Sequence, residues 1–402
     1  RDYYASRGLG DVYKRQYKVW DYLRKNTDRR HPTSIAKMRK DENINAYIGD
    51  KETINRLLKD MANIMNLEDG GSDYKPEAEW RLYFDDFKKF YGDKERYERD
   101  DSDEDDSYIA NVMRIKNLYY NRTFSEKEID SIIDGIMATR TLDSKSAQEL
   151  VRKVEDNMTT VFYKRTPRHI CKVQEPELAD RELLKDNLAI IQKAIDDNVR
   201  IQFRFNGYSY EKKLEPVRAE MDELSPYYIV ASGGKYYLLA AKEYEGYKPN
   251  MSIWRIDLMT DIEIPGRNDR LHIKGIPRIP KKNVSNLPEK WSEDFQLKHL
   301  NMSFDKPVPV TLRIKSEKCE GNPKKRVRPG YTFLHDWFGD SFTYIRTEKE
   351  PPYDDIVRVE CSPYGMAHWA LQYSELVEVL EPESLREDIK NKIKALNEKY
   401  SL

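Results

Sequence analysis

A polar stripe within residues 51–66 carries side chains that can recognise the bases of DNA. An arginine can present two donors to guanine, an asparagine can pair with adenine in the same way, and a lysine suits a phosphate. Apolar residues recur beside the stripe at helical spacing, which predicts a helix that packs through one face and turns the stripe outward. The apolar residues are Ile54, Leu57, Leu58 and Met61, and the stripe consists of Glu52, Asn55, Arg56 and Lys59. Contact with double-stranded DNA is one interpretation, and solvated residues on an ordinary helix are the other.

The segments before the stripe predict two further helices. Apolar residues from Val19 to Leu23 can share one face of a first helix. Pro32 ends the preceding structure, and Thr33 or Ser34 can cap a short second helix. Asp50 can accept hydrogen bonds from the first N–H groups of the helix that carries the stripe. This arrangement meets the requirement of a helix-turn-helix, whose last helix packs through one face and offers the other to a major groove.

Residues 68–120 predict an enlarged wing that follows the helices. The stretch 68–76 is rich in turn residues, and 112–120 has the pattern of a strand that returns to the helices. Between them lies the acidic run Arg99–Asp106, which is typical of a solvated loop. Residues 17–122 are therefore expected to form a winged helix-turn-helix head.

The first sixteen residues, 1–16, show no clear periodicity. They resemble the translation of a sequencing adapter, so we expect a non-native or disordered segment there. A natural flexible arm is the alternative.

The composition sets limits on partners and location. With 402 residues the chain is expected to hold several domains. Its formal charge of −1 excludes a uniformly positive coat but allows a local basic surface for nucleic acid. The sequence has neither an apolar run that could span a bilayer nor an export signal, so we expect a cytoplasmic protein without a membrane partner.

Residue types that could serve catalysis or metal binding do not occur at the spacing that such sites require. The three cysteines lie far apart and predict neither a disulfide framework nor a metal site: they are Cys171, Cys319 and Cys361. The sequence shows no nucleophile–base pair and no glycine-rich phosphate loop. His335 and Asp336 are neighbours, but adjacency does not make a catalytic pair. We therefore expect no enzyme activity, no catalytic residues and no cofactor.

A helical linker is expected over residues 123–180. Ser125, followed three residues later by Glu128, forms a capping box at the start of one helix. Residues 144–157 predict a second helix.

The pattern then changes to short strands. A helix at 183–198 precedes alternating segments joined by turns, and Gly233-Gly234 supplies one of the turns. The predicted strands are 200–205, 226–231, 236–241 and 252–258. They predict a small β-barrel over 181–266. The Pro- and Lys-rich stretch 267–304 is expected to be a linker, and 305–402 an α/β domain.

Three segments of the barrel region resemble the WYL family. They are Ser225–Ala231, Lys235–Leu239 and Trp254–Leu258. The name-giving Trp-Tyr-Leu triplet is Tyr236-Tyr237-Leu238 here, and Leu258 replaces the second arginine of the usual Phe-Arg-Leu-Asp-Arg strand. Residues 121–125 resemble the Arg-x-Phe-Ser segment of the family's linker helices, and 308–396 resemble its C-terminal extension domain.

The resemblance implies an α+β multidomain regulator with an Sm/SH3-like barrel that binds an effector. A nucleotide or nucleic acid is the implied effector, and a homodimer is the implied assembly. The implied effector contacts are Ser225, Tyr227, Tyr236, Tyr237, Arg255 and Asp257. Tyrosine rings can stack on bases, and arginine offers a fixed fork of donors. The same aromatic residues could instead fill the barrel core, and Arg255 could simply pair with Asp257.

These observations predict a ligand-responsive transcription regulator that binds a double-stranded DNA operator. The alternative is an accessory protein that binds RNA or single-stranded DNA and modulates a nuclease or defence system. The outward-facing stripe on residues 51–66 favours the regulator.

Overall fold

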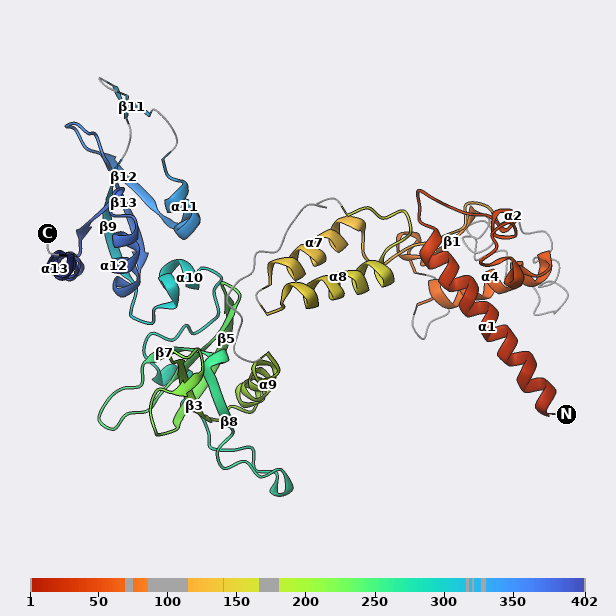
Figure 1. The fold of residues 1–402 in the computed structure, drawn as a ribbon, viewed down its shortest axis with the longest axis horizontal. Coiled ribbons are helices and arrows are strands. Elements are labelled where there is room, and N and C mark those ends of the chain that lie inside the picture. The colour runs from red at the N-terminus through yellow and green to blue at the C-terminus, as the bar shows by residue number, and fades with distance from the viewer. Residues whose placement is uncertain are drawn as a thin grey trace. The chain divides into compact units, whose positions relative to one another are not determined.

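The computed structural model describes residues 2–68, 75–85, 115–139, 141–165, 181–315, 318–319, 322–326 and 330–400. The chain forms two compact units, Arg1–Pro176 and Glu177–Leu402 (Figure 1). The acidic run 99–106 and Cys171 lie outside the described residues. Among the described residues, no helix combines the length and apolarity needed to cross a membrane.

Four helices form the start of the first unit: α1 (Asp2–Asn26), α2 (Ile35–Met38), α3 (Asn45–Ile48) and α4 (Lys51–Asn66). Over residues 1–16 we expected a non-native or disordered segment. α1 is helical from Asp2 onward (Figure 1), and a non-native origin of the segment stays a prediction. Two predicted caps are confirmed. Ser34 accepts a hydrogen bond from the Lys37 amide, and Asp50 accepts one from the Thr53 amide at 2.8 Å. The short helix α3 was not predicted.

A small antiparallel sheet packs with these helices. Its strands β1 (Leu82–Tyr83) and β2 (Tyr119–Tyr120) pair with each other, and Thr33 adds a bridge to Leu118. A 3-10 turn, η1 (Glu77–Glu79), precedes β1. The core of the head combines residues of α1, α4 and β1, including Leu23, Leu58 and Leu82, each 0% exposed.

The side chain of Asn66 joins α4 to β1. Its Nδ2 donates to the Leu82 carbonyl at 2.8 Å. Its Oδ1 accepts from the amides of Arg81 at 2.8 Å and Leu82 at 3.2 Å. Asn66 is 0% exposed, so water does not compete for these bonds.

The linker helices α7 (Glu126–Ala138) and α8 (Ser144–Met158) lie side by side in Figure 1. The predicted capping box is confirmed, because Ser125 Oγ accepts from the Glu128 amide and the Glu128 carboxylate accepts from the Ser125 amide. Ile129, Ile133 and Val151 form the core between the helices. The chain after α8 returns to the head, where the Val161 amide donates to the Lys25 carbonyl at 3.0 Å.

The second unit begins with α9 (Arg181–Asp197) and a curled antiparallel sheet. The strands are β3 (Ile201–Tyr208), β4 (Leu214–Pro216), β5 (Asp222–Ser232), β6 (Lys235–Ala241), β7 (Met251–Arg255) and β8 (Met259–Glu263). They pair in the order β4-β3-β5-β6-β7, while β8 pairs β3 after the short turn η3 (Ile256–Leu258). Gly233 and Gly234 have φ values of +54° and +72° and form the predicted turn between β5 and β6. The result is a half-barrel, and α9 covers one face of it with Leu184, Ile191 and Ala194.

The segment 267–304 is not a free linker. It carries η4 (Asp269–Leu271), η5 (Lys281–Asn283), α10 (Phe295–Lys298) and η6 (Leu300–Met302). Phe295 and Met302 pack on the face of the half-barrel opposite α9, against Val230, Leu239 and Met251. The expectation failed because a composition rich in Pro and Lys does not prevent apolar side chains at wide spacing from being buried.

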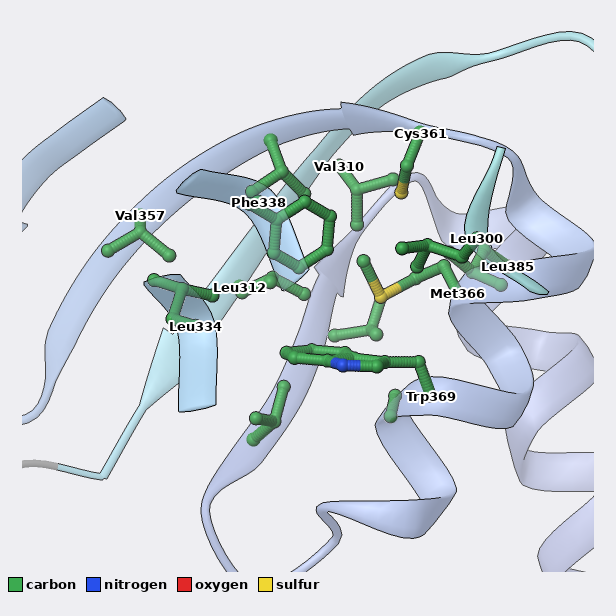
Figure 2. Packing of buried hydrophobic residues seen from close by; sticks show 14 of the residues in the cluster. Leu300, Val310, Leu312, Leu334, Phe338, Val357, Cys361, Met366, Trp369 and Leu385 are labelled. Atoms are coloured by element: carbon green, nitrogen blue, oxygen red, sulfur yellow. The ribbon is translucent and has the colours of Figure 1, made fainter. Parts of the chain in front are cut away.

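The C-terminal elements form a four-stranded sheet with helices and a separate two-stranded sheet of β10 and β11. They are β9 (Val308–Ile314), β10 (Lys318–Cys319), β11 (Asn322–Arg326), α11 (Thr332–Phe338), η7 (Gly339–Ser341), β12 (Thr343–Thr347), β13 (Asp355–Cys361), α12 (Pro363–Gln372), β14 (Val377–Glu381) and α13 (Glu383–Tyr400). The sheet order β12-β13-β9-β14 with intervening helices is a split βαβ arrangement. Trp369, 0% exposed, meets Phe338 edge-on at 5.2 Å between ring centroids (Figure 2). The predicted α/β character of this region is therefore confirmed.

We predict that Asn66→Ala lowers the free energy of unfolding of the first unit by about 1–3 kcal/mol, because it leaves buried backbone groups of β1 without partners. Urea unfolding monitored by circular dichroism measures the change. Asn45→Ala, at the exposed start of α3, serves as a control with little expected effect. Equal stability of Asn66→Ala and the control would contradict the role of Asn66.

Candidate DNA-contact and effector sites

The exposed half of α4 carries Arg56 near its middle. The Arg56 side chain is 56% exposed and its Nη2 lies 2.9 Å from Glu52 Oε1, where the Glu52 side chain is 42% exposed. Lys59 is half-buried at the edge of this half. Three of the four predicted stripe residues therefore reach solvent together, and their contact with DNA stays a prediction.

Asn55 does not belong to this surface. It is 0% exposed and faces the core of the head, so the prediction that it points outward is wrong. The physical reason is a second buried row on α4: Asn55, Leu58, Ala62 and Asn66 recur at helical spacing, and each is 0% exposed. Apolar periodicity missed this row because its two ends are amides.

The predicted polar stripe on residues 51–66 did not include Asn63. It is half-exposed and lies seven positions after Arg56, which places both on the same side of α4 two turns apart. Its spacing of seven residues from Arg56 could have placed it in the stripe.

The head helices carry more basic than acidic residues. Residues 12–68 contain 13 lysines and arginines against eight aspartates and glutamates, a formal charge of +5, whereas the whole chain carries −1. A local positive field of this kind attracts polyanions.

Ser225 and Tyr227 of β5 are occupied by the segment 267–304. Ser225 Oγ accepts from the Ile279 amide at 3.0 Å, and the Tyr227 hydroxyl donates to the Ile279 carbonyl at 2.7 Å. Their exposures are 1% and 2%, and burial raises the pKa of Tyr227. The Arg278 guanidinium lies over the Tyr227 ring, 5.0 Å from its centroid. In this structure both side chains therefore bind the segment 267–304 and are buried beneath it.

Tyr236 and Tyr237 lie on opposite faces of the half-barrel. Tyr236 packs with the core beneath α9, whereas Tyr237 packs with Phe295 on the other face. Successive residues of a strand point to opposite sides, so one ligand on one face cannot contact both rings. The six predicted effector contacts therefore do not all lie on one face of the half-barrel.

Arg255, Asp257 and Tyr237 are brought together at the end of β7. Arg255 is the strand partner of Tyr237. Its Nε and Nη2 donate to the two carboxylate oxygens of Asp257 at 3.1 and 2.6 Å. The Arg255 side chain is 30% exposed and that of Asp257 1%. The hydrogen bond that Arg255 donates to Asp257 raises the pKa of Arg255, and the charges of Asp257, Tyr237 and Tyr208 raise it further.

Tyr208, 48% exposed at the end of β3, was missed by the sequence analysis. The predicted strand ended at residue 205, whereas β3 continues to Tyr208.

Comparison with known families identifies the last part of the chain. Residues 306–396 match the family model described as the WCX domain. These residues are similar to a WCX domain and are given that name below. They lie where the WYL resemblance predicted a C-terminal extension domain, and their elements β9–α13 run from cyan to blue in Figure 1.

Solved structures show weaker likeness. One is proteasome accessory factor B/C (PafBC) of Arthrobacter aurescens, at 15% identity and a TM-score of 0.23, covering 87% of this chain and 54% of that chain. This chain thus spans about half of the PafBC structure. Another is a CRISPR Cas-related protein, at 12% identity and a TM-score of 0.30, covering 97% of this chain and 92% of that chain. No curated protein matches the chain.

We predict that Ser225→Ala and Tyr227→Phe each lower the free energy of unfolding of the unit that carries the WCX domain by about 0.5–3 kcal/mol, because each removes a buried hydrogen bond to Ile279. The double variant tests whether the two bonds are coupled. Tyr210→Phe, at a position 94% exposed, is the matched control. Variants as stable as the control would show that these hydroxyls are not needed for the fold and would restore them as candidate contacts.

Proposed function

We propose that this chain is a DNA-binding transcription regulator of the WYL type, with a winged helix-turn-helix head. The observation that carries the proposal is α4, which buries one half of its surface and presents Arg56 on the other. The pairing of Thr33, β1 and β2 behind the helices fits a winged head. The WCX domain supports the WYL assignment, since this extension accompanies WYL barrels in the family that the sequence resembles.

Arg56 is the residue proposed to read a base. Its ion pair with Glu52 spans one helical turn and holds the guanidinium along the exposed half of α4. On contact with DNA, the guanidinium can present two donors to guanine, while Glu52 can accept from the amino group of a neighbouring cytosine. Lys59 is placed to approach a phosphate at the edge of the same surface.

The proposed assembly is a homodimer that binds a palindromic operator in the cytoplasm. Two heads related by a twofold axis read two half-sites, and the separation of the half-sites mirrors that of the heads. A ligand regulates such a dimer only if it binds two arrangements of the heads with different affinity.

Replacing Arg56 by Ala is expected to weaken specific DNA binding about 5–150-fold, which corresponds to the loss of one bidentate base contact. The binding site is first selected from a random pool of double-stranded DNA, and affinities are then measured at fixed salt. Lys153→Ala, on the exposed side of α8, is the control for loss of a positive charge.

Two results would contradict the DNA proposal. Unchanged specific binding by Arg56→Ala would remove α4 as the recognition helix. A protein that selects no double-stranded site but retains RNA or single-stranded DNA would instead support the accessory role in a nuclease or defence system.

The effector surface is proposed at the Arg255 edge of the half-barrel. Asp257 engages Nε and Nη2 of Arg255, which fixes the orientation of the fork and leaves Nη1 for an anionic ligand. Tyr237, the strand partner of Arg255, can supply aromatic contact, which suits a nucleotide or a short single strand.

We predict that Arg255→Ala abolishes the change in operator affinity produced by added single-stranded oligonucleotides of mixed sequence. Because Ala leaves the buried Asp257 without its cation, Arg255→Lys is measured in parallel: it keeps a positive charge but loses the fork. Arg270→Ala, at an exposed position of η4, is the control. A full response in both Arg255 variants, with unchanged melting temperatures, would exclude Arg255 from the effector site.

A further inference from the structure

A cavity of about 570 Å³ lies between the head and the linker helices of the first unit. Its walls come from the turn after α1, the segment after β2, the first turn of α7 and the end of α8. Small-molecule sites commonly have volumes of roughly 300–1,000 Å³. The residues proposed above to contact DNA or the effector do not line it.

Two arginines stand at the rim of this cavity. The side chains of Arg29 and Arg30 are exposed, and within the described part of the chain their guanidinium groups have no hydrogen-bond or ion-pair partner. The neighbouring Asp28 is committed to the turn itself: its Oδ1 accepts from the amides of Arg30 and His31, both at 2.7 Å. Asp28 therefore fixes the turn that carries the two arginines.

The charged residues of the lining carry a net formal charge of +1, from four basic and three acidic side chains: Arg29, Arg30, Arg122 and Lys127 against Asp28, Glu126 and Glu128. The Glu128 carboxylate also serves the capping box of α7, where it accepts from the amide and hydroxyl of Ser125 at 2.8 Å. The cavity therefore keeps a net positive charge for a ligand.

Apolar side chains contribute to the wall of the cavity, and Thr160 adds a hydroxyl. Phe124 is 38% exposed, Ile129 is buried and Met158 half-buried. Thr160, 9% exposed, accepts from the Phe162 amide at 3.2 Å through its Oγ. The hydroxyl proton of Thr160 can therefore be donated to an acceptor in the cavity.

The cavity is well separated from the recognition surface of α4. Asn66, at the last turn of α4, bonds to Arg81, and the Asn121 amide of the cavity wall bonds to the Arg81 carbonyl at 2.7 Å. Arg56 lies ten residues earlier on α4, which is about 15 Å along the helix. Arg56 does not line the cavity.

We propose that this cavity binds a small organic anion, a carboxylate or a phosphate ester, attached to an aromatic or apolar body. The anionic group pairs with Arg29 and Arg30, and the body packs on Phe124, Ile129 and Met158. Such a ligand contacts the head and the linker helices at once. The site is independent of the effector surface at Arg255.

Calorimetric titration of the full chain tests the proposal with phenyl phosphate and benzoate, which distinguish a phosphate from a carboxylate. Inorganic phosphate lacks the apolar body and phenol lacks the charge. At least one aromatic anion is expected to bind, and both partial probes to bind about tenfold or more weakly, since each forfeits one part of the site. Absence of binding by both aromatic anions at millimolar concentration would overturn the proposal.

The location of the site is tested with variants. Arg29→Ala combined with Arg30→Ala is expected to weaken binding about tenfold or more, and Met158→Trp to block it by filling the cavity. Lys145→Ala, at the opposite end of α8, is expected to bind normally. Normal binding by the arginine double variant, or weakened binding by Lys145→Ala, would place the ligand elsewhere and refute the site.

Discussion

The rotational setting of α4 about its own axis is the constraint on which the proposed DNA surface depends. Successive residues of a helix are separated by about 100° around the axis, so a shift of one residue would exchange Asn55 with Arg56 between core and solvent. Two buried rows oppose such a shift: the apolar row of Ile54 and Leu57, and the row that runs from Asn55 to Asn66. The amide of Asn66 adds a directional restraint, because its bonds to β1 are satisfied in one orientation only.

Features that depend on neighbours in the sequence could be predicted. The caps at Ser34, Asp50 and Ser125 are local hydrogen bonds, and each is present. The α/β character of residues 305–402 was also predictable, since β13 and β14 alternate and the last helix follows a clear stop. Asn55 was misplaced for the opposite reason: a polar side chain enters the core through tertiary packing that a count of apolar positions does not register.

The effector contacts were harder to predict because the decisive partners are distant in sequence. Ser225 and Tyr227 are held by Ile279, which lies more than fifty residues later in a segment expected to be a linker. Residue identity gives no sign of such a partner. Arg255 and Asp257, by contrast, are two residues apart, and their pairing was foreseen as one of two alternatives. The structure shows this pair, and the proposed role of Arg255 requires that the pair also accept a ligand.

The surface beside Arg255 is connected to the WCX domain by continuous packing. Tyr237 shares a face of the half-barrel with Phe295 and Met302. Phe295 stacks on His299 at 4.1 Å between ring centroids, and the Ser362 amide at the start of α12 donates to the Lys298 carbonyl at 2.7 Å. Packing alone does not transmit a signal, since coupling requires a second arrangement that a ligand prefers. The ion pair of Arg255 with Asp257 is the place where an anion can create that preference. A negative ligand at Nη1 brings a second anion close to a carboxylate that is 1% exposed, and the repulsion between the two charges favours an arrangement that separates them.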